Sequence, residues 1–321
     1  MPCGICAVVN FNGLTQADLD SFTHTLVQSE KRGKDATGAA LQSQDFIKAP
    51  MPASDYVKTN AYKHFLRKAL GQKWIVGHTR HATQGDPKDN INNHPILIHP
   101  RNSLLVFNGI VSSNTIKEDE SKTDTYIIVD AIKKHWVSGN LAESVKKAYK
   151  EFWGFSATIA STKNEIVFTA SGNPLRRGSL PNGSKVFASD TDFFPEGTTD
   201  NEFFKPGTQL SYDEKGSSKI MQVEMAERPV VKFESDWDGG YFKTFEEGDE
   251  DNWDKLQTTI PAYYPTKTYE YKPIKVKESI PIVSERGRKF RRRKHRRIKP
   301  RKSRYGAHIS RILKRTRGWE Y

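Results

Sequence analysis

The chain has 321 residues, which is enough for one large or two ordinary domains with a buried core. Hydrophobic residues make up 36% of it, its mean hydropathy is -0.71, and no apolar run reaches membrane-spanning length, so we expect no membrane span. Its two cysteines, Cys3 and Cys6, exclude a disulfide framework and favour a reducing, cytoplasmic compartment. We expect no secretory signal, because the first residues lack a basic segment followed by an apolar one.

The net charge of +13 is spread unevenly along the sequence. Residues 285–317 hold 17 Lys and Arg against one acid, Glu285, whereas the rest of the chain holds 34 basic and 37 acidic residues. The body of the protein is therefore close to neutral. The basic character belongs to the C-terminal part of the sequence, where a polyanion such as nucleic acid would be attracted.

Periodicity predicts a series of short elements in chain order. The apolar stretch 5–11 predicts a buried strand, Asn12-Gly13 predicts a turn, and the capping pattern that begins at Thr15 predicts a helix. Further strands are predicted at 38–41, 73–78, 103–107, 155–160, 165–170, 184–189 and 208–212, and further helices at 60–70, 124–136 and 140–152. Because strands and helices cluster instead of alternating, we expect sheets covered by helices.

Composition divides the chain into three parts. We predict a folded domain at 3–225, where the periodic elements lie. Residues 226–284 are predicted to form a linker or extended arm, because an acidic stretch at 234–254 is followed by a segment rich in Pro, Tyr and Lys. Residues 285–321 form the basic tail, whose composition is typical of an extended or solvated segment.

Six short motifs occur in one order along the predicted domain. They are Cys3-Gly-Ile, Arg32-Gly-x-Asp-x-x-Gly38, Gly77-His-Thr-Arg-x-Ala-Thr-x-Gly85, Asn93-His-Pro, Asn108-Gly-Ile and Thr123-Asp-Thr. In this order and spacing, they resemble the class II glutamine amidotransferase domain, the glutaminase half of the glucosamine-fructose-6-phosphate aminotransferases and amidophosphoribosyltransferases. The resemblance covers about 3–220. It implies an α+β fold, the four-layer αββα sandwich of the N-terminal-nucleophile hydrolases, and cleavage of L-glutamine into glutamate and ammonia.

The chemistry of amide hydrolysis fits the residues that carry this resemblance. Cys3 is the expected nucleophile, and its own α-amine, once freed, is the expected proton acceptor. The Asn108 side chain and the Gly109 N–H are the expected oxyanion hole. Arg80 is expected to bind the α-carboxylate of glutamine and Asp124 its α-ammonium group.

The remaining predicted site residues are supporting ones. Thr79, Thr83 and the backbone around Gly85 are expected to line the pocket, with Thr83 and Gly85 contacting the substrate. Arg32 is expected to brace the cysteine end of the chain. No cofactor and no metal ion is expected, because Cys3 and Cys6 supply only two of four metal ligands and His24 and His64 show no ligand spacing. His78, His94 and His99 are expected to be structural residues.

Each site residue also has an ordinary structural interpretation. Cys3 taken alone is more typical of a small buried hydrophobe than of a nucleophile, and Cys6 is expected to be buried in the first strand. Asn108-Gly109 is the dipeptide of a hairpin turn. Arg80 fits a surface charge, and Asp124 fits the N-cap of the helix that follows it. Only the co-occurrence of the motifs favours the enzymatic interpretation.

Three departures from the family pattern bear on activity. Met1 and Pro2 precede Cys3, so its nitrogen is an amide unless the chain is cut after Pro2. His81 stands where the family commonly has Trp, and Gln84 stands where it commonly has His. Both flank the expected glutamine-binding loop.

The sequence beyond the predicted domain lacks the length and pattern of an ammonia-consuming enzyme. We therefore expect a glutaminase subunit that passes ammonia to a separate acceptor enzyme. The alternative is a catalytically silent domain of this fold that acts through its basic tail on nucleic acid or a protein partner. For residues 286–317, contact with a polyanion and a solvated tail both remain open.

Overall fold

The computed structural model describes residues 3–98, 100–117 and 122–228. The predicted arm at 226–284 falls outside them except for its first three residues, as does the whole basic tail. His99 is also outside them.

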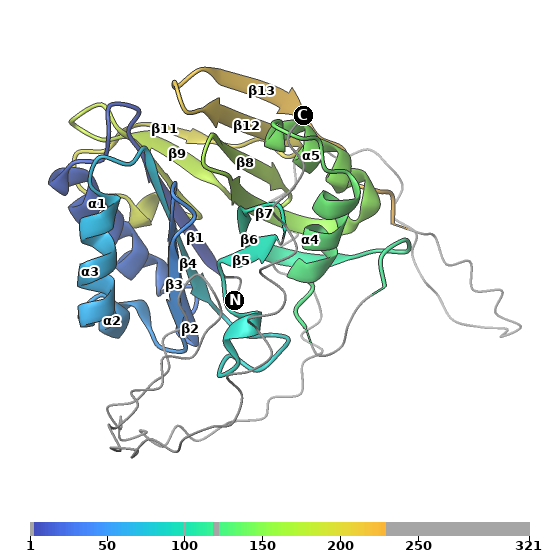
Figure 1. Ribbon diagram of the computed structural model, residues 1–321, viewed down its shortest axis with the longest axis horizontal. Helices are drawn as coiled ribbons and strands as arrows, with labels where there is room; N and C mark the ends of the chain where they lie inside the picture. Colours follow the sequence, from blue (N-terminus) through green and yellow to red (C-terminus); the bar gives the residue numbers. More distant parts are fainter. Residues whose placement is uncertain (1–2, 99, 118–121, 229–321) are drawn as a thin grey trace, which may run out of the picture. The chain divides into compact units, whose positions relative to one another are not determined.

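Two antiparallel sheets form the centre of the described domain (Figure 1). The first has the strand order β11-β9-β10-β1-β4-β2-β3, and the second has the order β13-β12-β8-β7-β6-β5. The strands of the first sheet are β1 (Gly4–Val9), β2 (Ala36–Leu41), β3 (Phe46–Ala49), β4 (Trp74–Arg80), β9 (Arg176–Ser179), β10 (Lys185–Ala188) and β11 (Thr199–Phe203). Those of the second are β5 (Ile96–Ile98), β6 (Ser103–Ser112), β7 (Trp153–Ser161), β8 (Glu165–Ser171), β12 (Thr208–Asp213) and β13 (Ser218–Gln222).

Helices cover the outer face of each sheet. The helices α1 (Gln16–Ser29), α2 (Ala53–Tyr56) and α3 (Asn60–Ala69) lie on the first sheet, and α4 (Thr125–Lys134) and α5 (Leu141–Ala148) lie on the second (Figure 1). Short 3-10 helices span Asn90–Asn92, Tyr149–Glu151 and Thr191–Phe193. The predicted four-layer αββα sandwich is confirmed.

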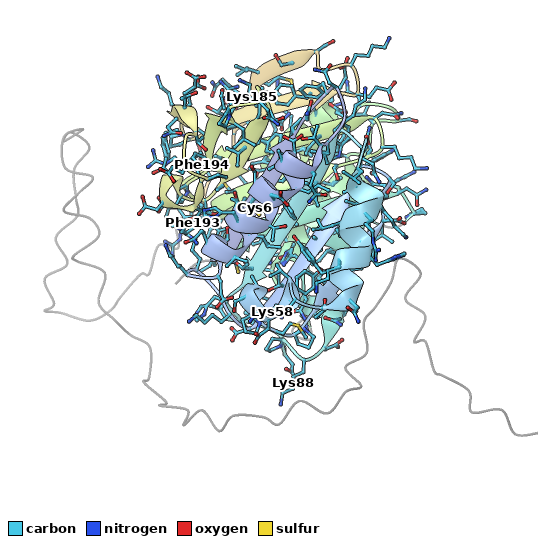
Figure 2. All side chains as sticks on the ribbon, turned by 90° about the vertical axis from the view of Figure 1, so that its left-hand side faces the viewer. Cys6, Lys58, Lys88, Lys185, Phe193 and Phe194 are labelled. Carbon is cyan, nitrogen blue, oxygen red and sulfur yellow. The ribbon has the colours of Figure 1, made fainter. Side chains whose placement is uncertain are left out.

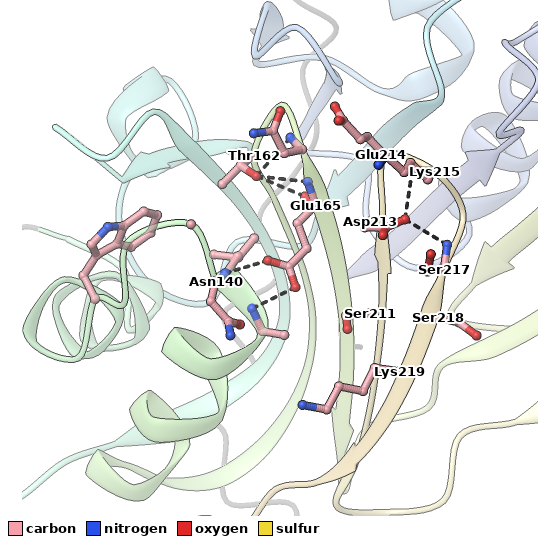
Figure 3. Close-up of a pocket in the computed structure, with 15 residues that line it drawn as sticks. Asn140, Thr162, Glu165, Ser211, Asp213, Glu214, Lys215, Ser217, Ser218 and Lys219 are labelled. Atoms are coloured by element: carbon pink, nitrogen blue, oxygen red, sulfur yellow. Dashed lines mark hydrogen bonds between the residues drawn. The ribbon is translucent and has the colours of Figure 1, made fainter.

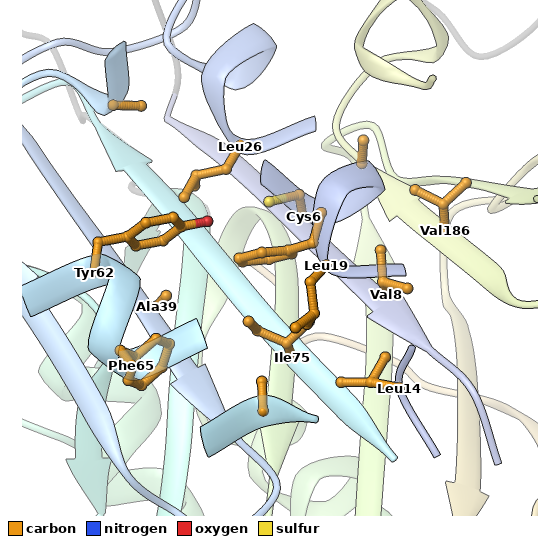
Figure 4. Packing of buried hydrophobic residues seen from close by; sticks show 14 of the residues in the cluster. Cys6, Val8, Leu14, Leu19, Leu26, Ala39, Tyr62, Phe65, Ile75 and Val186 are labelled. Carbon is orange, nitrogen blue, oxygen red and sulfur yellow. The ribbon is translucent and has the colours of Figure 1, made fainter. Parts of the chain in front are cut away.

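Strand β1 shows why the sequence begins with a continuous apolar run. Its odd-numbered residues, Ile5, Ala7 and Val9, pack between the two sheets, and its even-numbered residues, Cys6 and Val8, pack beneath α1. Since side chains alternate along a strand, a strand covered on both faces needs apolar residues at every position. Figure 4 shows Cys6 and Val8 among side chains of α1 and α3. Cys6 is a buried core residue, as predicted.

The layer between the sheets is closed by aromatic packing. The rings of Phe168 from β8 and Phe187 from β10 stack with centroids 3.8 Å apart, so they join one sheet to the other. This layer continues toward the N-terminal end of β1. There the alternation that places Ile5, Trp74 and Val106 between the sheets also points Arg80 and Asn108 into the same layer.

Most predicted elements are present with small changes of boundary. The first strand ends at Val9 instead of residue 11, and the helix predicted at 140–152 ends at Ala148 and continues as a 3-10 turn. The predicted helix at 60–70 is α3, and it stops where Gly71 adopts a φ of 75°. Strands β3, β5, β9, β11 and β13 were not predicted.

Candidate active site

Cys3 lies immediately before the central strand β1, and its side chain is half-buried. The backbone N–H of His81 donates to its Sγ at 3.4 Å, and the thiol contacts the His81 carbonyl oxygen at 3.6 Å. The Arg32 side chain donates through Nε to the Cys3 carbonyl oxygen at 3.0 Å. Arg32 is therefore hydrogen-bonded to the residue that immediately precedes β1.

Close backbone approach around the cysteine depends on Gly4. A Cβ on this residue would lie 2.5 Å from Thr79 Oγ1 and 2.8 Å from the Ser29 carbonyl oxygen. Thr79 is fully buried and donates its hydroxyl to Ser29 O at 2.7 Å. Thr79 thus holds α1 against the first sheet, and it does not line the cavity beside Cys3.

The electrostatics of the Cys3 thiol favour its protonated form. Burial raises the pKa of Cys3, and this outweighs the opposite effects of the His81 backbone and of Arg80 and Arg32. Because the thiolate is the nucleophilic form, a reaction at Sγ near neutral pH needs a group that accepts the thiol proton.

Arg80 ends β4 and is almost completely buried, with 3% of its surface exposed. Its Nη1 donates to Asn93 Oδ1 at 2.8 Å, and its Nη2 donates to the carbonyl oxygens of Gln84 and of Gly85, the latter at 2.9 Å. Burial lowers the pKa of Arg80, but a guanidinium remains charged in proteins. Arg80 is therefore a buried cation, and its interpretation as an ordinary surface charge is wrong.

Asn93 connects Arg80 to the loop that follows β4. Its Nδ2 donates to Pro87 O at 2.7 Å, and its carbonyl oxygen accepts from Lys48 Nζ at 2.6 Å. Lys48 also donates to Pro95 O at 3.0 Å, so one ammonium group holds both sides of His94. Lys88 lies farther out in this loop and projects away from the helices in Figure 2.

The buried ammonium of Lys48 makes a testable contribution to the pH dependence of stability. Burial lowers the pKa of Lys48 to about 7 in the folded protein. In the unfolded chain the pKa of Lys48 is the ordinary lysine value of about 10.4. Between pH 7 and this value the unfolded chain binds more protons than the folded chain, so the free energy of unfolding rises with pH in this range. Below pH 7 both states are protonated and the cost of burying the charge is fully present.

We therefore expect wild type to gain roughly 1–3 kcal/mol relative to Lys48→Met between pH 7 and pH 9. Urea unfolding of both proteins at several pH values measures this gain. The comparison cancels the titration of buried tyrosines and cysteines. A constant difference between the two proteins across this range would contradict the expected result.

Asn108 and Gly109 lie inside β6, which continues to Ser112, so the hairpin-turn interpretation is wrong. Gly109 faces Ser156 of β7, and a Cβ on it would lie 2.0 Å from the Phe155 carbonyl oxygen. The side chain of Asn108 is fully buried, and neither its Nδ2 nor its Oδ1 has a hydrogen-bond partner among the described residues. A buried amide of this kind costs free energy, which a bound ligand would recover.

Asp124 occupies the N-cap position of α4, but its side chain makes no capping hydrogen bond. Its Oδ2 instead accepts from the backbone N–H of Val111 at 3.0 Å, and its own N–H donates to Gln84 Oε1 at 3.3 Å. The simple capping interpretation of Asp124 is therefore wrong. The carboxylate ties the start of α4 to β6, two residues beyond Gly109.

A small cavity of about 30 Å³ brings these groups together. Its lining residues come from distant parts of the chain and are Cys3, Arg80, His81, Thr83, Gln84, His94, Phe107, Gly109, Thr123, Asp124 and Thr125. Five predicted site residues (Cys3, Arg80, Thr83, Gly109 and Asp124) are among them. Asn108 adjoins Gly109, whereas Gly85 is not on the wall and contacts Arg80 through its carbonyl group.

His94 and Thr123 are two of the six lining residues for which no catalytic or binding role was predicted. His94 stacks on His78 with ring centroids 4.1 Å apart and shares a hydrogen bond with Thr125 Oγ1 at 3.1 Å. Burial holds the pKa of His94 well below its usual range, so its imidazole is neutral. Thr123 is buried, and its Oγ1 has no partner among the described residues. In the sequence, only their places inside the motifs Asn93-His-Pro and Thr123-Asp-Thr indicated that His94 and Thr123 lie at the site.

A second cleft of about 610 Å³ lies between the start of α5 and the β12–β13 hairpin (Figure 3). The carboxylates of Glu165 and Asp213 are hydrogen-bonded to other residues that line the same cleft. Glu165 accepts from the N–H groups of Leu141 and Ala142, and Asp213 accepts from those of Lys215 and Ser217. It contains no cysteine and no buried arginine, so the smaller cavity is the better candidate for amide chemistry.

No protein-family model matches the chain. It is 28% identical over 259 residues to glutamine–fructose-6-phosphate aminotransferase of Thermotoga maritima, which covers 74% of this chain and 41% of that protein. The corresponding enzyme of Aquifex aeolicus is 30% identical over 201 residues, which cover 58% of this chain and 32% of that one. The chain thus spans about two fifths or less of the length of these relatives.

Solved structures agree on the fold. Glutamine phosphoribosylpyrophosphate amidotransferase of B. subtilis superimposes with a TM-score of 0.52 at 19% identity, over 70% of this chain and 50% of that one. A structure described as the allosteric regulatory enzyme of purine biosynthesis gives a TM-score of 0.56 at 20% identity, over 70% and 49% of the two chains. The described domain resembles the class II glutamine amidotransferases in both sequence and fold.

This amidotransferase-like domain shows no cluster of three His, Cys, Asp or Glu side chains suited to a metal ion within the described ranges. In the same ranges, every helix is too short or too polar to cross a membrane. The comparisons do not reach the individual site residues. The roles of Cys3, Arg80, Asn108 and Asp124 therefore rest on the geometry given above.

Proposed function

We propose that this chain hydrolyses L-glutamine to glutamate and ammonia, with Cys3 as the nucleophile. The observation that carries the proposal is the convergence of a thiol, a buried guanidinium and a carboxylate on one cavity beside an unpartnered Asn108 amide. Arg80 and Asp124 have opposite charges, which is what the α-carboxylate and α-ammonium groups of a free amino acid require. Similarity to enzymes named as glutamine aminotransferases and amidotransferases supports the same substrate.

The reaction proceeds in two halves. The Cys3 thiol loses its proton to a base, and Sγ attacks the side-chain amide carbon of glutamine. The resulting oxyanion accepts hydrogen bonds from Asn108 Nδ2 and the Gly109 N–H. The C–N bond then breaks as the leaving nitrogen takes up the proton, and water hydrolyses the thioester to glutamate and regenerates the thiol.

Removal of Met1 and Pro2 would free the α-amine of Cys3, which then serves as that base. The intact mass of the purified protein tests this step, and a chain that begins at Cys3 supports it. The cavity of about 30 Å³ holds little more than a water molecule, so glutamine entry requires the loop that contains Thr83 and Gln84 to move outward.

Ammonia is proposed to pass to a separate acceptor enzyme. Support comes from the relatives, which are named as aminotransferases that act with glutamine. The contact of residues 286–317 with a polyanion lies outside the described residues and stays a prediction. The cytoplasmic location of the protein also stays a prediction.

Arg80→Lys tests the proposed substrate class. A lysine has a single ammonium group, whereas the guanidinium group of Arg80 donates to three acceptors. We therefore expect the KM for glutamine to rise by roughly 10- to 100-fold, with a smaller effect on kcat. Glutamate release measured against glutamine concentration gives both constants. Arg67→Lys, on the exposed side of α3, is the control. An unchanged KM in Arg80→Lys would remove the argument for a carboxylate clamp.

A further inference from the structure

Gln84 lines the cavity from the loop that follows β4, but the proposed reaction gives it no role. Its side chain reaches the start of α4, where Oε1 accepts the backbone N–H of Asp124 at 3.3 Å. Asp124 is the N-cap residue of α4, and the first N–H groups of a helix have no acceptor within the helix. Gln84 therefore supplies, from the loop, an acceptor that α4 itself does not provide.

The main chain of Gln84 is held by the arginine. Its carbonyl oxygen accepts from Arg80 Nη2, and Arg80 Nη1 donates to Asn93 Oδ1 at 2.8 Å. Gln84 is thus hydrogen-bonded to Arg80 through its main chain and to Asp124 through its side chain. These are the two residues to which the proposed function assigns the α-carboxylate and the α-ammonium group of glutamine.

The two charged residues are anchored in different sheets. Arg80 ends β4 of the first sheet, whereas the Asp124 carboxylate accepts from the N–H of Val111, in β6 of the second, at 3.0 Å. The carboxylate and ammonium groups of an amino acid are attached to one carbon atom. A site that binds both must therefore hold its cation and its anion at a fixed separation. A residue bonded to both, as Gln84 is, restrains that separation directly.

We propose that Gln84 is a positioning residue that sets the separation of Arg80 and Asp124, and that it makes the site selective for substrates with an ammonium group beside the carboxylate. The selectivity rests on the proposed function, whereas the hydrogen bond between the loop and α4 is testable without it. This bond breaks when the loop moves outward to admit glutamine, and it forms again over the bound substrate. Gln84 thereby couples closure of the loop to the placement of Asp124.

Gln84→Met tests the proposal, because methionine has a similar length but no group that accepts the Asp124 N–H. The matched control is Gln16→Met on the exposed side of α1, which also loses one side-chain hydrogen bond, that to Asp20 Oδ1. Hydrolysis by the full-length proteins is measured with L-glutamine and with 4-carbamoylbutanoate, which is glutamine without its α-ammonium group. Both reactions release ammonia, so one assay serves for both.

We expect kcat/KM for L-glutamine to fall roughly tenfold in Gln84→Met, with most of the change in KM, because one hydrogen bond that positions a binding group has an effect of this size. We expect kcat/KM for 4-carbamoylbutanoate to stay within about twofold of wild type. The preference of the enzyme for glutamine should therefore fall. Gln16→Met should match wild type with both substrates.

Alkylation of Cys3 by iodoacetamide gives a second measurement, which needs no substrate. The N–H of His81, in the same loop, lies 3.4 Å from Cys3 Sγ, so a loop that opens more often exposes the sulfur more often. We expect alkylation to be about 2- to 10-fold faster in Gln84→Met than in wild type, and unchanged in Gln16→Met. Cys6 is fully buried and does not compete for the reagent.

Two results would overturn the proposal. The first is a preference for glutamine in Gln84→Met equal to that of wild type, which includes an equal loss with both substrates, because a purely structural role would affect both alike. The second is alkylation of Cys3 at the wild-type rate. If wild type hydrolyses neither substrate, the proposed glutaminase function fails, and the alkylation rate alone decides whether Gln84 holds the loop.

Discussion

Cys3→Ala is expected to lower glutamate release from glutamine by roughly 1,000-fold or more, because no other group can form the thioester. The half-buried Sγ is at the cavity wall, and its removal leaves Arg80, Asp124 and Gly109 in place. Glutamine should therefore still bind, and its affinity for the variant should be close to its affinity for the wild type. The measurement is glutamate release by the purified variant, together with glutamine binding by calorimetry.

Cys6→Ala is the matched control, because it removes the chain's other thiol from a site with no access to the cavity. Cys6 is fully buried beneath α1, so its loss should reduce stability without a comparable loss of kcat. Cys3→Ser adds a graded case, since a hydroxyl is a weaker nucleophile at the same position. Glutaminase activity that survives Cys3→Ala would exclude Cys3 as the nucleophile.

Asn108→Leu is expected to lower kcat by roughly 100- to 1,000-fold, which is the usual effect of removing an oxyanion-hole donor. Substitution of a buried polar residue that has hydrogen-bond partners usually destabilises the fold. For Asn108 we expect a loss of kcat without a loss of stability, because both of its side-chain amide atoms lack partners among the described residues. A buried unpaired amide costs about 1–3 kcal/mol, so a leucine of similar size should leave the free energy of unfolding unchanged or increase it.

Steady-state kinetics and urea unfolding of the same Asn108→Leu preparation measure the two quantities. The combination of a large loss of kcat with retained stability is the signature of a site built for a ligand. Asn164→Leu, on the exposed β7–β8 connection, controls for the change of residue type. A variant that loses stability but retains kcat would show that Asn108 has a structural role alone.

The sequence was most informative where local patterns coincide with local structure. The continuous apolar run of β1, the capping pattern at Thr15 and the glycine after α3 each act within a few residues, and all three elements are present. Two of the unpredicted strands have identifiable causes. β5 has three residues and β11 is exposed along its whole length, so neither carries the apolar alternation from which a strand is recognised.

Asn108-Gly109 shows the limit of local reasoning. The dipeptide favours a turn, but the pairing of β6 with β7 along its whole length keeps it extended. Gly109 is required there because the backbone of Phe155 leaves no room for a Cβ. That constraint comes from a neighbour 46 positions away in the chain, which no window of sequence contains.

The sequence by itself determined the layers of this protein and the family that its motifs resemble, since both depend on spacing along the chain. Only the tertiary structure decided that Arg80 is buried and held by its own loop, that the Asp124 side chain bonds β6 instead of capping α4, and that Thr79 lies off the cavity. The physical reason is that hydrogen-bond partners and burial are set by segments that meet across two sheets.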